Sequence, residues 1–134
     1  MRRSRQYTGA HARAGLDAEL PEIETFENQF PGYEIEFITD EFQSVCPKTG
    51  LPDQGTLILR YVPYKSCLEL KSLKMYLVAY RNIGIFQENV VNRYLRDVVE
   101  ACDPVRAEVV GEFAARGGIS SRITARHERP RRKR

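Results

Sequence analysis

The sequence predicts an α+β domain in which a four-stranded antiparallel sheet carries two helices on one face. Three observations support this prediction. Apolar and polar residues alternate at 33–39, a β-rich apolar run occupies 56–62, and two helical stripes separate these segments from a late alternating pair. The element order is therefore strand, strand, helix, helix, strand, strand, and the helices cover one face of the sheet.

The first two strands differ in how they face solvent. In residues 33–39, YEIEFIT, apolar side chains alternate with acidic ones, which indicates a strand with one solvated face. Residues 56–62, TLILRYV, are apolar on both faces and indicate a more central strand, which Pro63 ends.

Two helices are predicted next. A capping-box pattern, Ser66 followed by Glu69, marks the start of the first helix. Its apolar stripe consists of Leu70, Leu73, Leu77 and Tyr80. The second helix runs from about Phe86 to Cys102, where the apolar periodicity is cleanest, and Asp103-Pro104 ends it.

The last two strands form a predicted hairpin. Residues 105–115 alternate again, Arg116-Gly117-Gly118 is a hairpin signal, and 119–125 form a short final strand. The second sheet face and the edge strands would remain open, although 56–62 is apolar on both faces. We therefore expect a homo-oligomer, in which several subunits assemble into a barrel.

The chain of 134 residues has the length of one domain, which we place at 21–125. Residues 1–20 and 126–134 are polar and basic, and we expect both to be disordered tails. Residues 122–134 hold seven basic residues and one acidic residue, so the folded body is net negative despite the total charge of +3. An acidic body argues against a nucleic-acid-binding fold. A small RNA-binding module that uses the tail RHERPRRKR stays open as an alternative.

The cysteine and histidine counts narrow the class of protein. There are three scattered cysteines and two histidines, and both histidines lie in the polar ends. We expect neither a disulfide framework nor a metal site, and a reducing cytoplasm fits best. No apolar run reaches the roughly 18 residues of a membrane span, and no apolar segment follows the N-terminal arginines, so we expect neither an anchor nor a secretory signal.

The stretch SVCPKTGLPDQG, residues 44–55, carries the first candidate chemistry. Cys46 lies among turn residues, where Lys48 or a helix start could lower the pKa of its thiol. An inert, half-buried cysteine is the alternative. Asp53 lies in a second turn, where an aspartate often bonds only its own backbone. Cys102 belongs to a helix stripe and indicates core, and Cys67 is most simply a small residue beside a helix cap.

The stretch ELKSLKMY, residues 69–76, carries the second. Lys71 and Lys74 share a helix face and could hold the phosphates of a dinucleotide, or they could simply be solvated. Glu69 could act only as a cap. Glu88 could stabilise the dipole of the second helix or accept two hydrogen bonds from a planar base. No GxGxxG occurs, so a Rossmann site is not supported.

Together, CPKTGLPD, ELKSLKMY, RNIGIFQEN and RGGIS resemble the NADPH-dependent 7-cyano-7-deazaguanine reductases, the nitrile reductases of queuosine biosynthesis (QueF family). The resemblance is to the short, single-module type and covers about residues 26–121. It implies a tunnelling fold (T-fold) assembled into multi-subunit barrels. It also implies an oxidoreductase that converts the nitrile to 7-aminomethyl-7-deazaguanine and consumes two NADPH, without a metal.

The resemblance implies a role for each matching residue. Cys46 would be the nucleophile that forms a covalent thioimide, and Asp53 would be the proton donor. Substrate-binding roles fall to Leu68, Glu69, Leu70, Gln87 and Glu88. Contacts to NADPH fall to Lys71, Ser72 and Lys74. Active sites at subunit interfaces are expected, with no membrane and no specific nucleic acid as partners.

One departure and two relatives qualify this interpretation. The family commonly has His-Glu where this chain has Gln87-Glu88, so we expect Gln87 to bind substrate without carrying a proton. GTP cyclohydrolase is disfavoured because its zinc-binding Cys/His set has no counterpart here. An archaeal amidinotransferase type also attacks a nitrile through cysteine but lacks the NADPH signature, and the presence of ELKSLKMY favours reduction.

Overall fold

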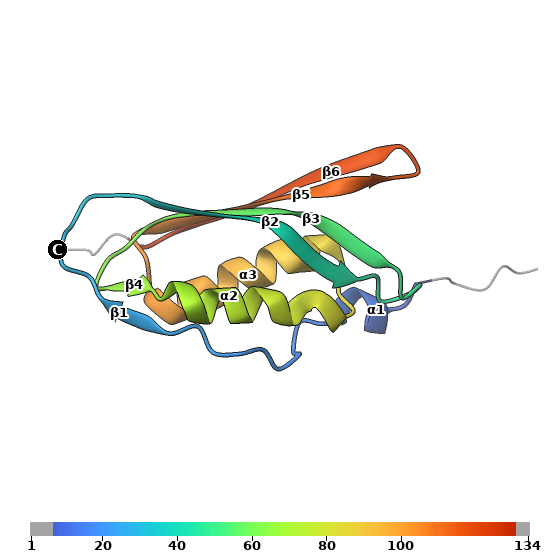
Figure 1. Cartoon of the computed structure of the whole chain (residues 1–134), viewed down its shortest axis with the longest axis horizontal. Helices are drawn as coiled ribbons and strands as arrows, with labels where there is room; N and C mark the ends of the chain where they lie inside the picture. The colour runs from blue at the N-terminus through green and yellow to red at the C-terminus, as the bar shows by residue number, and fades with distance from the viewer. Residues whose placement is uncertain (1–6, 131–134) are drawn as a thin grey trace, which may run out of the picture.

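A computed structural model describes residues 7–130, and residues 1–6 and 131–134 lie outside the described part. Four antiparallel strands form one layer in the order β2-β3-β5-β6. Helices α2 and α3 lie together on one face of this sheet (Figure 1). The predicted α+β class and the predicted order of the main elements are confirmed.

Three of the four main strands are longer than the sequence patterns indicated, and β5 has the predicted length but is shifted by one residue. They are β2 (Ile35–Val45), β3 (Pro52–Val62), β5 (Arg106–Arg116) and β6 (Ile119–Glu128). The predicted glycine hairpin joins β5 to β6, with φ of 59° at Gly117 and 83° at Gly118. These left-handed values suit glycine because it has no Cβ.

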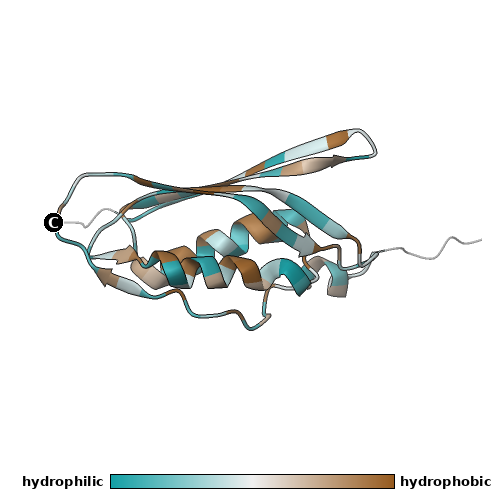
Figure 2. Ribbon diagram, viewed as in Figure 1, coloured by the Kyte–Doolittle hydropathy of each residue, from teal (hydrophilic) through white to brown (hydrophobic). Residues whose placement is uncertain are grey.

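The second predicted helix is confirmed almost to the residue. Helix α3 (Gln87–Cys102) begins after the N-cap Phe86 and ends at Asp103, whose φ is 44°. Its apolar stripe packs onto the sheet, where each fully buried aliphatic side chain contributes about 1.5–3 kcal/mol. The fully buried members of the stripe are Val90, Val91, Tyr94 and Val98. Figure 2 shows brown, apolar segments along the helices and the sheet.

The first helix starts later than predicted. Helix α2 (Leu70–Val78) is followed by a 3-10 turn (Ala79–Asn82), and its N-cap is Glu69. Ser66 instead belongs to β4 (Ser66–Leu68), which pairs with β1 (Thr25–Glu27). Strands of three residues are too short to produce a recognisable alternation, so this small second sheet was not predicted.

The outer face of the main sheet, opposite the helices, carries charges. Ion pairs cross the strands between Arg60 and Glu34, between Arg122 and Glu112, and between Arg126 and Glu108, at 3.0, 2.7 and 2.7 Å. This differs from the expectation for 56–62, because its outward positions include exposed Arg60 and only half-buried Ile58. Exposed ion pairs of this kind contribute little to stability, but they keep the face compatible with water.

Residues 7–20 also differ from the expected disordered tail. They contain helix α1 (Gly9–Arg13) and then run alongside α3. Three side chains on one face of α3 donate to their carbonyl groups: Asn89 to Ala12, Arg93 to Gly15 and Arg96 to Leu16, at 2.7, 2.6 and 2.9 Å. We call residues 7–18 the N-terminal strap. At the other end, β6 extends the fold to Glu128, and 131–134 of the expected tail lie outside the described residues.

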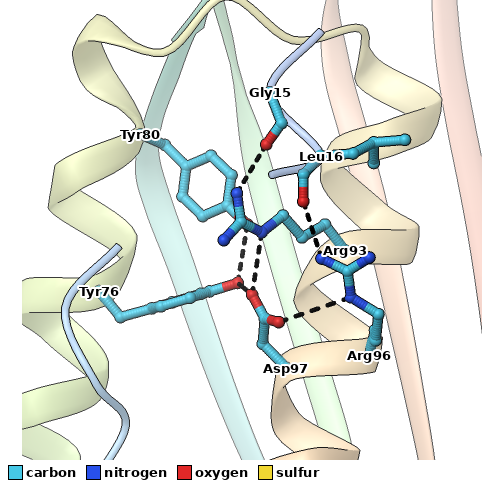
Figure 3. A network of polar contacts seen from close by, with 7 residues as sticks. All are labelled: Gly15, Leu16, Tyr76, Tyr80, Arg93, Arg96 and Asp97. Atoms are coloured by element: carbon cyan, nitrogen blue, oxygen red, sulfur yellow. Dashed lines mark hydrogen bonds and ion pairs between the residues drawn. The ribbon is translucent and has the colours of Figure 1, made fainter. Parts of the chain in front are cut away.

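A buried polar network joins the strap to both helices (Figure 3). Arg93 bonds the strap and also pairs with Asp97 at 3.1 Å. The Tyr76 hydroxyl donates to Asp97 and lies 2.7 Å from the Tyr80 hydroxyl. Burial raises the pKa of both tyrosines, so they stay neutral hydrogen-bonding groups.

Replacing Gly15 by alanine tests how closely the strap packs on the loop before α3. Gly15 has φ +83°, and a Cβ there would lie 2.6 Å from Ile85 Cβ and 2.8 Å from the Gly84 oxygen. Gly32 has φ +77° with nothing nearby, so Gly32→Ala carries only the backbone cost of about 1–2 kcal/mol. We expect Gly15→Ala to lose a further amount of about 1–3 kcal/mol from overpacking, measured by urea denaturation. Equal losses in the two variants would contradict the close contact.

Candidate active site

The turn between β2 and β3 holds Cys46. The Cys46 N–H donates to the Leu51 carbonyl, and the Gly50 N–H donates back to the Cys46 carbonyl, both at 2.9 Å. Gly50 has φ +72°, which lets the chain reverse within these few residues. The turn therefore leaves Cys46 half-buried at one end of the sheet.

Hydrogen bonds favour the thiolate form of Cys46. Desolvation raises the pKa of this thiol, but hydrogen bonds from the Thr49 side chain and from the Thr49 and Lys48 N–H groups outweigh it. The pKa therefore lies below its ordinary value, although the charge of Asp53 opposes the shift. The Thr49 hydroxyl also accepts the Leu51 N–H at 3.2 Å, which orients its own proton. Lys48 thus acts through its backbone and not through its ammonium group.

The other two cysteines are buried. Cys102 is core, as predicted, and burial raises the pKa of its thiol to about 12. Cys67 is buried in β4, where its sulfur lies 3.3 Å from the Tyr33 hydroxyl. A thiol must ionise to act as a nucleophile, so Cys46, half-buried and with a lowered pKa, is the candidate nucleophile.

Asp53 does not lie in a turn, as the sequence suggested, but in strand β3. It is buried, with 5% of its surface exposed, and its Oδ1 accepts from Arg116 Nη1 at 2.5 Å. The strand register places it opposite Ser44, two residues before Cys46. The interpretation of Asp53 as a turn-forming residue is therefore wrong, and the carboxyl group is held on the same sheet end as the thiol.

A short backbone bridge holds the segment before α3 against the end of β2, next to Cys46. The Val45 N–H donates to the Ile83 carbonyl at 3.0 Å, and the Ile85 N–H donates to the Val45 carbonyl at 2.9 Å. Gln87 follows directly, and its Oε1 accepts from the Ser121 hydroxyl at 2.7 Å. Glu88 is exposed in the first helical turn. A cysteine, a buried carboxyl group, an amide and a carboxylate thus share one end of the subunit.

The remaining predicted site residues lie at the opposite end. The Leu68 N–H donates to the Tyr61 hydroxyl at 2.9 Å, and Tyr61 is eight residues along β3 from Asp53. At the usual rise per strand residue this separates the two groups by about 26 Å. In Figure 1, β4 and the start of α2 lie at one end of the fold, and α1 and the start of α3 lie at the other. Leu68, Glu69 and Leu70 therefore do not meet Cys46 within one chain.

Two residues of ELKSLKMY, Glu69 and Ser72, make hydrogen bonds that stabilise the fold. The Glu69 carboxylate accepts from the Lys71 and Ser72 N–H groups at 2.7 and 2.8 Å, which lowers its pKa. Glu69 therefore does cap α2, but as its N-cap and not as the third residue of a capping box that begins at Ser66. Ser72 is buried, and its hydroxyl accepts from Glu24 N–H and donates to the Glu69 carbonyl. This engagement argues against its expected role in holding NADPH. Lys71 and Lys74 are exposed.

Three further side chains lie beside Asp53 or Gln87 and were not among the predicted site residues: Arg116, Ser44 and Ser121. Arg116 was recognised only as part of the RGGIS hairpin signal. Its contact with Asp53 spans 63 positions of sequence, and Ser121 reaches Gln87 across 34. Contacts this distant depend on strand register, which single-sequence periodicity does not supply.

Among residues 7–130, no cluster of metal-ligating side chains is present, and no helix there could span a membrane.

Replacing Thr49 by valine tests the electrostatics of the Cys46 turn. The change keeps the side-chain shape but removes a hydrogen bond that favours the thiolate, so the pKa of Cys46 should rise. We expect the pH profile of iodoacetamide alkylation to move upward by about one pH unit, followed at Cys46 by peptide mass spectrometry. Thr124→Val on β6 is the matched control. An unchanged pH profile would show that Thr49 does not lower the pKa of Cys46.

Comparisons with known proteins agree with this geometry. The family described as QueF-like protein matches residues 52–132. A protein of Elusimicrobium minutum named NADPH-dependent 7-cyano-7-deazaguanine reductase is 54% identical over 92% of this chain and 94% of its own length. One of the same name from Chlorobaculum tepidum is 56% identical over 80% of this chain and 93% of its own length.

A solved structure supports the fold. The apo archaeosine synthase QueF-Like matches with a TM-score of 0.65 over 69% of this chain and 91% of that chain, at 22% identity. This likeness agrees with the tunnelling fold that the sequence motifs implied. With a family match over most of its length and relatives above 50% identity, the chain belongs to the QueF family of NADPH-dependent 7-cyano-7-deazaguanine reductases.

Proposed function

We propose that this chain reduces the nitrile of 7-cyano-7-deazaguanine to the primary amine of 7-aminomethyl-7-deazaguanine, with NADPH, in queuosine biosynthesis. The observation that carries the proposal is the pairing of a thiol of lowered pKa, Cys46, with a buried carboxyl group, Asp53, at one sheet end. A nitrile carbon is an electrophile for a thiolate, and its nitrogen needs a proton as the addition proceeds.

The reaction assigns separate tasks to these two residues. The Cys46 sulfur forms a bond to the nitrile carbon, one C–N π bond breaks, and Asp53 protonates the nitrogen to give a thioimide. NADPH supplies a hydride to this carbon twice. Asp53 gives the nitrogen a second proton after the first hydride, and the Cys46 thiolate then leaves as an iminium forms. Two hydrides and two protons account for the conversion of C≡N to CH2NH2.

Recognition of the base falls to the start of α3. Glu88 is exposed and can accept two hydrogen bonds from the edge of the deazaguanine ring. Gln87 contributes an amide that Ser121 already holds by its oxygen, which leaves the amide NH2 to donate. An amide does not titrate, so Gln87 serves binding only.

A second copy of the chain would complete the site. Within one chain, Leu68 is bonded to Tyr61, which lies about 26 Å along β3 from Asp53, a distance that no side-chain movement closes. We propose a homo-oligomer in which the segment 68–70 of one subunit meets the Cys46 end of another. Lys71 and Lys74, exposed on α2 beside the segment, would bind the NADPH phosphates, without Ser72. Three free thiols fit a cytoplasmic location.

Two other functions are less well supported. An amidinotransferase would use the same thioimide, but the match to an archaeosine synthase is at 22% identity, whereas the named reductases are above 50%. An RNA-binding module would depend on the basic end of the chain. Several of its arginines, Arg122, Arg126 and Arg129, are already paired with carboxylates of the fold.

Intact mass spectrometry tests the nucleophile directly. Mixing the protein with the nitrile base alone should give a covalent adduct, and adding NADPH should then oxidise two NADPH per amine. We expect Cys46→Ala to abolish both the adduct and the oxidation, because no other thiol is both accessible and easily ionised. Cys102→Ala, in the core, is the control that should keep the adduct. An adduct that still forms with Cys46→Ala would contradict the proposed mechanism.

Mixing two inactive variants tests the shared site. Cys46→Ala and Glu69→Ala each damage a different half, so co-refolded mixed oligomers should contain intact sites. If every site takes one half from each of two subunits, equal mixing should restore about a quarter of wild-type turnover. The control is Cys46→Ala mixed with Asp53→Asn, whose defects lie in the same half and should not complement. No recovery in the first mixture would favour a site within one chain.

A further inference from the structure

Ser44 is a buried hydroxyl whose role the reaction has not yet explained. Its side chain is completely buried, and within residues 7–130 its Oγ has no hydrogen-bond partner. Buried polar groups are nearly always hydrogen-bonded, because desolvating an unsatisfied hydroxyl destabilises the fold. A residue that costs stability in the free protein is a candidate for function.

Strand geometry places Ser44 beside Asp53. It is the register partner of Asp53 across the β2–β3 pair, so the two side chains lie on the same face of the sheet. Alternation along β2 puts Phe42 and Ser44 on the helix-facing side, where both are buried. Cys46 follows one residue after β2 ends, at the start of the turn. Opposed Cβ atoms on one face are about 4.5–5.5 Å apart, which a serine rotamer change can bridge.

The protonation state of Asp53 must change during the reaction. The nitrogen takes two protons in one turnover, so the carboxyl group gives up a proton, regains one from solvent and gives it up again. Arg116 can only donate hydrogen bonds, so its positive charge favours the ionised carboxylate and it cannot accept the proton of the protonated carboxyl group. A hydroxyl can donate to a carboxylate and can also accept from a protonated carboxyl group.

We propose that Ser44 is a positioning residue for Asp53: after a rotamer change its hydroxyl donates to the ionised carboxylate and accepts the proton of the protonated carboxyl group, which Arg116 cannot accept. The proposal rests on the proposed function, in which Asp53 protonates the nitrogen. Ser44 does not touch the reacting atoms and acts through the carboxyl group alone. Its effect should therefore appear in the proton-transfer steps and should disappear when Asp53 cannot carry a proton.

Ser44→Ala is the test, with single-turnover rates of adduct formation and steady-state NADPH oxidation as readouts. Loss of a hydrogen bond to a charged group should lower kcat by about 10- to 100-fold, with little change in KM for the nitrile base. Alkylation of Cys46 by iodoacetamide should be unchanged. The melting temperature should stay the same or rise, because the variant removes an unsatisfied hydroxyl.

A double-mutant cycle separates this role from a merely structural one. In an Asp53→Asn background, Ser44→Ala should cause no further loss of rate. Ser121→Ala is the matched control, since its hydroxyl contacts Gln87, and its loss should persist in the Asp53→Asn background. Two results would overturn the proposal. One is a Ser44→Ala enzyme with wild-type rates, and the other is a loss of rate from Ser44→Ala that is equally large in the Asp53→Asn background and in the wild-type background.

The proposed function can fail without deciding the role of Ser44. If the wild type forms the adduct but oxidises no NADPH, the reductase function is wrong. The first proton still reaches the nitrogen during adduct formation, so slower adduct formation in Ser44→Ala would then still support the positioning role. An unchanged rate of adduct formation would reject it.

Discussion

The backbone bridge at Val45 is the constraint on which the site depends. Both hydrogen-bonding groups of this residue are committed, one to Ile83 and one to Ile85. The bridge joins the end of β2 to the segment that leads into α3, and it places Gln87 and Glu88 beside the Cys46 turn. Packing of α3 on the sheet and the Ser121–Gln87 bond fix the helix on the sheet, and the bridge adds the direct link from the helix start to the strand end that precedes Cys46.

The N-terminal strap reinforces that constraint from outside. Gly15 packs directly on the Gly84 carbonyl and Ile85, and the strap is tied to α3 through Arg93. Arg93 in turn belongs to the buried network with Asp97 and Tyr76, which connects α2 to α3. A buried charge needs partners. The network around Arg93 draws its members from three segments: the strap, α2 and α3. Local sequence showed only a polar, small-residue segment, so its order comes from tertiary contacts that composition does not reveal.

The parts of the fold that the sequence predicted are those with strong local periodicity. Helix α3 follows from its stripe, and the β5–β6 turn follows from two glycines that adopt positive φ. The site was predictable in a different way. Cys46 stood out by its turn residues, but the preferred interpretation of Asp53 from its own neighbours was a turn. Its role came only from resemblance, and its burial comes from strand register. Ser44 and Arg116 depend on the same register, which no local pattern encodes.

The departure at Gln87 has a consequence for the proton path. Where relatives of this type can place a titrating imidazole, this chain has an amide that Ser121 holds in place. His11 is engaged in the cap of α1, and His127 lies on β6 opposite Ala107, at the far end of the strand from the hairpin that carries Arg116. With Glu88 proposed to bind the base, Asp53 is the carboxyl group of the described site to which our proposed reaction assigns protonation of the nitrogen. A single carboxyl group that must act twice in one turnover needs partners for both of its charge states, and Arg116 and Ser44 are the two side chains that the fold sets beside it.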